Sequence, residues 1–131
     1  MDSKQSYQIP GTLGEADQAR IKELVLLPIL LTLLERDRRA VESSSLKMKE
    51  AYLAWLERAA DAVHRDLAAI RRSLKEKKIS LYLEAKDESG IRYLYVYRGY
   101  QDRMFLRWEY VKAEVEERLA AYTRPAGHPP E

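Results

Sequence analysis

The 131-residue chain contains no cysteine. The absence of thiols excludes a disulfide framework, a cysteine-containing zinc finger and thiol chemistry. It fits a reducing compartment, and we expect a cytoplasmic protein. Asparagine is absent too, and charged residues make up 34% of the chain. This composition is typical of thermophilic proteins, although a GC-rich genome produces a similar bias.

Histidine and glycine are also scarce, with two and five copies. His64 falls on the predicted surface of a helix, and no second histidine stands at a metal-ligand spacing from it. The sequence has no glycine-rich phosphate loop and no G-x-S-x-G nucleophile motif. We therefore predict a non-enzymatic protein with no catalytic residues, no metal and no cofactor.

Long hydrophobic runs are missing as well. The longest apolar stretch, residues 24–34, has eleven residues and includes Pro28 and Thr32. A membrane span needs about 20 apolar residues, so this stretch predicts a buried helix. The first residues are polar, so we expect no signal peptide there. We expect no membrane partner.

The organising pattern of the chain lies in residues 46–78. Apolar residues recur there at alternating steps of three and four, which predicts one long helix with a narrow packing seam. Only Lys49 interrupts the seam. A second apolar stripe runs beside it, through Met48, Tyr52, Trp55, Ala59, Ala62 and Ala69.

A first helix should precede this one. Thr12 and Glu15 form a T-x-x-E capping box that predicts its start. The following apolar run has no polar side, so the helix must be surrounded by protein. Pro28 should kink or break it. A serine of the hinge at residues 43–45 should cap the second helix, and so short a connection predicts an antiparallel helical hairpin.

From residue 79 the apolar period changes to two. Residues 79–86 and 91–98 read as strands, joined by the turn sequence Asp87-Glu-Ser-Gly90. Asp102 is a candidate cap for a last helix that ends near residue 122. The prediction is a mostly α, α+β domain over residues 12–123, in the order helix, helix, strand, strand, helix. Residues 1–11 and 124–131 are predicted to be flexible ends.

Tyrosine is the most unusual component, with nine copies against one phenylalanine. Tyrosine and arginine together are typical of protein interfaces. The candidate partner-binding residues are Arg92, Tyr93, Tyr95, Tyr97, Arg98 and Tyr100. A second interpretation stays open, since Tyr93, Tyr95 and Tyr97 would also serve to cover the helices.

The net charge of +2 is too small to indicate a polyanion partner. Positive charge is nevertheless concentrated at the end of the second helix, at Arg71, Arg72, Lys75, Lys77 and Lys78. Our main prediction is a small interaction or adaptor protein that forms a homodimer through its apolar helices. The alternative is a nucleic-acid-binding regulator that uses this basic end and the β-hairpin as a wing.

Overall fold

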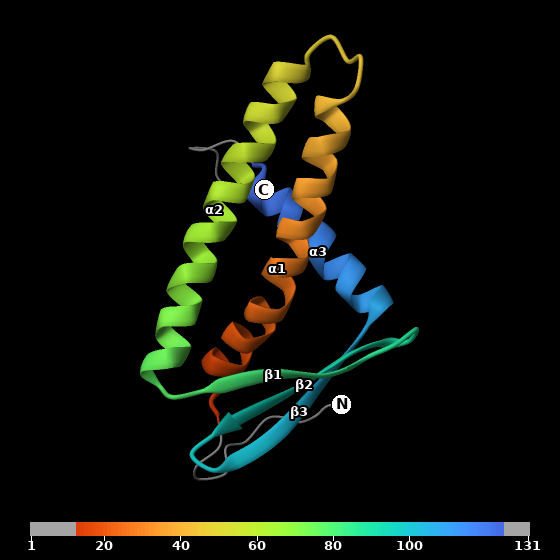
Figure 1. The fold of residues 1–131 in the computed structure, drawn as a ribbon. Helices are drawn as coiled ribbons and strands as arrows, with labels where there is room; N and C mark the ends of the chain where they lie inside the picture. The colour runs from red at the N-terminus through yellow and green to blue at the C-terminus, as the bar shows by residue number, and fades with distance from the viewer. Residues whose placement is uncertain (1–12, 125–131) are drawn as a thin grey trace.

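The computed structural model describes residues 13–124 and has a helical hairpin, a three-stranded sheet and a final helix (Figure 1). The elements are α1 (Glu15–Glu42), α2 (Lys49–Glu76), β1 (Ser80–Lys86), β2 (Gly90–Tyr97), β3 (Tyr100–Arg107) and α3 (Trp108–Tyr122). The predicted α+β class, rich in helix, is confirmed, and one strand more than predicted is present. Of the predicted flexible ends, 1–11 and 124–131, residues 1–11 and 125–131 lie outside the described residues.

Helices α1 and α2 lie antiparallel and form the predicted hairpin (Figure 1). Their contact holds the most buried side chains, including Leu26, Leu30 and Val63. Helix α1 continues through Pro28 without a break. Its N-cap is Gly14, with no side-chain cap, so Glu15 is the first helical residue. The prediction that Glu15 closes a capping box is therefore wrong, and Thr12 lies outside the described residues.

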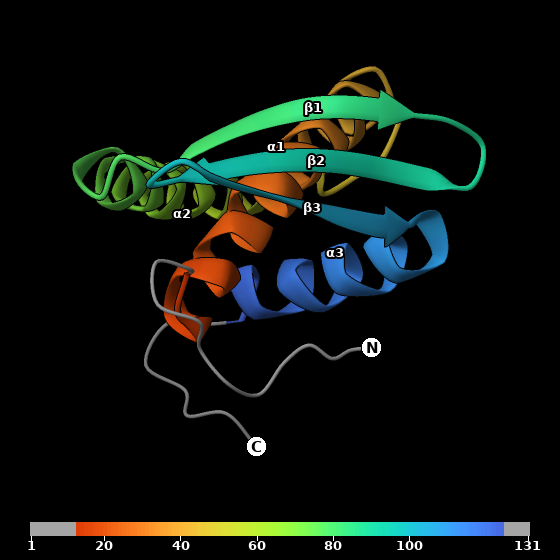
Figure 2. The same ribbon diagram turned by 90° about the horizontal axis from the view of Figure 1, so that it is seen from below.

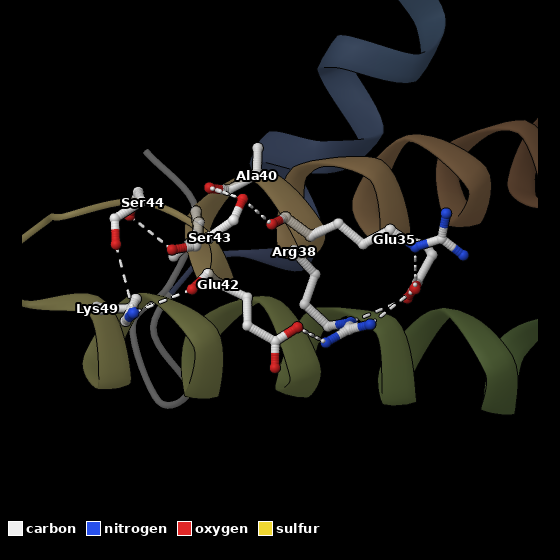
Figure 3. A network of polar contacts seen from close by, with 9 residues as sticks. Glu35, Arg38, Ala40, Glu42, Ser43, Ser44 and Lys49 are labelled. Carbon is white, nitrogen blue, oxygen red and sulfur yellow. Dashed lines mark hydrogen bonds and ion pairs between the residues drawn. The ribbon is translucent and has the colours of Figure 1, made fainter.

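The connection between the two helices also differs from the prediction (Figure 3). Ser43 is the C-cap of α1, and its hydroxyl donates to the carbonyl of Arg39 at 3.0 Å. The serines thus serve the end of α1, whereas the N-cap of α2 is Met48, without a side-chain cap. Lys49 Nζ donates to the carbonyls of Glu42 at 3.0 Å and Ser44 at 3.3 Å. Lys49 interrupts the seam because it satisfies free carbonyls at the helix end.

The sheet is antiparallel with the order β1-β2-β3. The turn between β1 and β2 is held by Asp87, whose carboxylate accepts from the backbone of Ser89 at 2.8 Å. Arg98 and Gly99 join β2 to β3 with φ of 55° and 79°, as a type I′ turn requires. Asp102 is no helix cap. It lies in β3 opposite Tyr95, and α3 begins only at Trp108.

One face of the sheet packs on the helices, at the end of the hairpin where α1 begins and α2 ends (Figures 1 and 2). Ile91 and Leu106 join the main core formed by the three helices, and a smaller cluster holds Leu13, Ile21, Leu74 and Ile79. The indole of Trp108 donates to the carbonyl of Asp87 at 2.7 Å, which anchors the start of α3 at the β1–β2 turn. The opposite end of the hairpin extends beyond the sheet.

Candidate interaction surfaces

The six predicted partner-binding residues do not form one surface, because side chains alternate across a strand. Tyr93, Tyr95 and Tyr97 are half-buried and pack against the core clusters on the helix-facing side. Arg92 points to the opposite face, and Arg98 lies in the turn, over the ring of Tyr97. The prediction of a mixed Tyr/Arg face therefore does not match the placement of these residues.

Three of the tyrosines nevertheless come together in a small cavity of about 80 Å³. We call it the tyrosine pocket. It is lined by Leu13, Gln18, Tyr95, Tyr97, Tyr100, Gln101 and Asp102. The type I′ turn creates it, because the turn brings β3 back beside β2 and sets Tyr100 directly opposite Tyr97. Leu13 and Gln18 come from the start of the described chain, and no sequence pattern indicates that they lie beside these tyrosines.

Tyr95 and Asp102 are the polar pair of the tyrosine pocket. The hydroxyl of Tyr95 donates to Oδ2 of Asp102 at 3.3 Å. Burial, followed by the charge of Asp102, raises the pKa of Tyr95 to about 12. The phenol therefore stays neutral at physiological pH. Oδ1 of Asp102 accepts from the backbone N–H of Arg103 at 2.8 Å, which orients the carboxylate.

The outer face of the sheet carries a second group of large side chains. By the strand register, Tyr82, Leu94 and Arg103 lie side by side there, as do Arg92 and Phe105. The guanidinium of Arg92 is 5.8 Å from the centre of the Phe105 ring. Arg103 pairs with Glu84 at 2.8 Å and lowers the pKa of that carboxyl. Arg92 and Arg103 are thus engaged within the sheet.

The C-terminal end of α3 packs against part of the second stripe of α2. The indole of Trp55 donates to the carbonyl of Thr123 at 3.4 Å, and the hydroxyl of Tyr122 donates to Asp66 at 2.5 Å. Ala59, between these contacts, is buried. Small side chains on α2 thus allow the end of α3 to approach closely. Burial and the Asp66 carboxylate raise the pKa of Tyr122.

From Trp55 at this contact toward the start of α2, the large apolar side chains are exposed. We call this group the distal patch, and it consists of Leu46, Met48, Tyr52 and Trp55. Each of them exposes at least 42% of its surface. The patch lies at the end of the hairpin that is remote from the sheet (Figure 1). In the sequence, Met48, Tyr52 and Trp55 belong to the second apolar stripe and Leu46 to the packing seam, but which part of the stripe α3 covers depends on the fold.

The basic cluster at the end of α2 is partly engaged. Lys77 Nζ lies 3.1 Å from both carboxylate oxygens of Asp17, a nearly buried residue of α1. The other four predicted cations, Arg71, Arg72, Lys75 and Lys78, are exposed. They lie at the same end of the hairpin as the sheet (Figure 1). The structure therefore brings the two parts of the predicted nucleic-acid surface to one end.

Polar side chains elsewhere serve the packing of the helices. Arg118 of α3 forms ion pairs with Glu23 of α1 and with Glu114. Near the distal end, Arg38 pairs with Glu35 and Glu42, and hydrogen bonds from Arg38 and Arg39 lower the pKa of Glu35 to about 2 (Figure 3).

Within residues 13–124, no group of three or more His, Asp or Glu side chains is placed to hold a metal ion. None of the described helices is long and apolar enough to cross a membrane.

Comparison with known proteins gives the family. The model of the family described as YhjD protein matches residues 12–126. The chain belongs to this family. A Bacillus subtilis (strain 168) protein, "Uncharacterized protein YhjD", is 28% identical over 102 residues, which are 78% of this chain and 85% of that protein. The similarity therefore extends over the helical hairpin, the sheet and α3 together. No solved structure matches the chain.

Proposed function

We propose that this YhjD-family protein is a non-enzymatic interaction protein that self-associates through the distal patch. The observation that supports this most is the uncovered continuation of the α2 stripe beyond the end of α3. Four large apolar side chains are exposed there, two in the first turns of α2 and two in the residues just before it. Exposed groups of large apolar side chains mark interaction sites. The cytoplasmic location expected from the missing cysteines is part of the same proposal.

A second copy is the occupant that best fits the patch. Two helical hairpins related by a twofold axis present the same patch to each other, which is the commonest way for a soluble protein to form a dimer. The stripe follows helical spacing, so two copies can form a four-helix contact. In such a dimer, α2 of one copy would contact α2 of the other, which has the same length and the same apolar stripe.

Sedimentation velocity at high micromolar concentration tests this proposal. The wild-type chain should sediment as a dimer, and the double variant Met48→Glu/Tyr52→Glu should sediment as a monomer with unchanged helical circular dichroism. Buried carboxylates without a partner strongly disfavour an interface, so the effect should be large. The matched control is Tyr82→Glu, because Tyr82 is an aromatic residue on the outer sheet face with an exposed fraction between those of Met48 and Tyr52.

Two outcomes would contradict the proposal. The first is a wild-type chain that is a monodisperse monomer at high micromolar concentration. The second is a dimer that Tyr82→Glu dissociates while the double variant leaves it intact, since this would place the contact on the sheet.

Nucleic-acid binding is the second candidate function. It is supported by the four exposed cations at the end of α2, which share one end of the molecule with the sheet. Fluorescence anisotropy with a mixed-sequence duplex tests it, because binding through phosphates weakens steeply with salt. The triple variant Arg71→Gln/Arg72→Gln/Lys75→Gln should reduce the salt slope, whereas Lys112→Gln on α3 should not. Absence of binding even at low salt would eliminate this candidate.

A further inference from the structure

We propose that the tyrosine pocket binds a methylated ammonium group, such as the head of a small quaternary amine. The site combines three aromatic side chains, Tyr95, Tyr97 and Tyr100, with one carboxylate, Asp102. Aromatic side chains around an acidic residue form the kind of cage that recognises such cations. This inference does not depend on self-association, because the distal patch lies at the opposite end of the helical hairpin (Figure 1).

The charge of the pocket favours a cation. The face of an aromatic ring is electron-rich, and a cation within about 6 Å of the ring centre is attracted to it. The ring of Tyr97 shows this attraction outside the pocket lining, since the guanidinium of Arg98 lies 5.1 Å from its centre. Asp102 adds a full negative charge. Among residues 13–124, no lysine or arginine forms a salt bridge with the Asp102 carboxylate.

The size and lining favour a methylated ammonium over a metal ion or a bare ammonium. A cavity of about 80 Å³ corresponds to a group of a few heavy atoms, not to a nucleotide or a peptide. Its walls include the apolar Leu13 and the tyrosine rings, which cannot replace the water shell of a small, strongly hydrated ion. A trimethylammonium group carries its charge on an apolar surface. It can therefore contact apolar walls, aromatic rings and one carboxylate at the same time.

The polar pair of the pocket is already arranged for this role. Tyr95 donates to Oδ2 of Asp102, while Oδ1 is held by a backbone N–H. The ring of Tyr95 packs against the small core cluster at the base of the sheet, which fixes its position. Binding therefore requires little ordering of Tyr95, which is half-buried, or of Asp102, which is exposed but held by two hydrogen bonds. Tyr100, which is half-exposed, forms the outer wall.

The test is a titration of the full-length, isotope-labelled chain with choline, followed by amide NMR shifts. The uncharged isostere 3,3-dimethylbutanol is titrated in parallel. Choline should shift the amides of the tyrosine pocket with a millimolar dissociation constant, and the isostere should bind much more weakly. Tyr100→Ala should weaken choline binding about threefold to fivefold, because it removes the cation–π contact of one exposed ring. Asp102→Asn, which keeps an acceptor for Tyr95, should weaken it to a similar extent.

Tyr82→Ala is the matched control, because Tyr82 and Tyr100 have similar exposed fractions, 55% and 51%, in the same sheet. This variant should bind choline like the wild type. The proposal is overturned if choline causes no shifts well into the millimolar range, or if the isostere binds equally well. It is also overturned if Tyr82→Ala weakens binding as much as Tyr100→Ala does.

Discussion

Substitution of Gly90 by alanine should be the most destabilising glycine replacement in the described chain. A β-carbon at this position would lie 2.3 Å from the backbone oxygen of Leu106 and 2.9 Å from Cζ of Phe105. The Phe105 ring can rotate away, but the Leu106 oxygen belongs to the β3 backbone, which pairs with β2 along its whole length. The two strands must separate by about 1 Å at this end, which weakens their hydrogen bonds.

The free energy of unfolding should fall by about 2 to 3 kcal/mol, because the overpacking and the weakened hydrogen bonds both destabilise the folded state. For a domain of this size that corresponds to a fall of roughly 10 °C in Tm. Thermal and urea unfolding followed by circular dichroism measure both quantities. The effect is steric, because Gly90 is not in the left-handed region.

Two other glycines provide controls, because they differ from Gly90 in backbone φ and in the space around an added β-carbon. Gly99 has open space around it but a φ of 79°, so Gly99→Ala should cost about 1 kcal/mol in backbone strain. Gly14 has neither a close neighbour nor a positive φ, so Gly14→Ala should change stability by only a few tenths of a kcal/mol. If Gly90→Ala proved no more destabilising than Gly14→Ala, the close approach of β2 and β3 would be refuted.

Three further predictions concern polar contacts. Lys49→Met should lower the free energy of unfolding in urea by about 0.5 to 1 kcal/mol, because two carbonyls lose their donor; stabilisation would instead mean that Lys49 faces the seam. Arg118→Met should cost about 1 to 3 kcal/mol in the same assay, since it leaves the carboxylates of Glu23 and Glu114 unpaired between α1 and α3, and a neutral result would refute that role. The pKa of Tyr95 is raised to about 12, so its contribution to stability is complete below its ordinary pKa near 10 and is lost as the pH rises from 10 to 12. Tyr95→Phe should make stability less dependent on pH in that window, and an unchanged alkaline unfolding profile would contradict the raised pKa.

The sequence predicted the two long helices and the first two strands because each carries a strong apolar period of its own. The third strand was missed for a physical reason. It is an edge strand, and Leu106 is its one buried residue, so no clear alternation of apolar and polar residues appears. Asp102 resembled a helix cap because aspartate is favoured there, whereas its actual position depends on pairing with β2.

The candidate sites were predictable to a smaller extent. Composition identified the region from Tyr93 to Tyr100, but the tyrosine pocket also needs Leu13 and Gln18, which lie some 80 residues earlier in the chain. No local pattern can indicate so distant a contact. The second stripe of α2 was visible in the sequence as well. Its division into a covered and an exposed part depends on where α3 ends, which is again a long-range property.

The positions of the two proposed surfaces make a joint prediction about shape. Helix α1 has 28 residues and is therefore about 42 Å long. The residues of the distal patch lie at the start of α2 and those of the tyrosine pocket at the start of α1 and around the β2–β3 turn, and Figure 1 shows these segments at opposite ends of the hairpin. Two copies joined through their distal patches would overlap over only a few helical turns, so their sheets would lie on the order of 70 Å apart. Small-angle scattering of the dimer should then show an elongated particle with its two pockets facing outward at the ends. A compact dimer would instead require contact through the sheets or along the sides of the hairpins, and its pockets would be close together or covered.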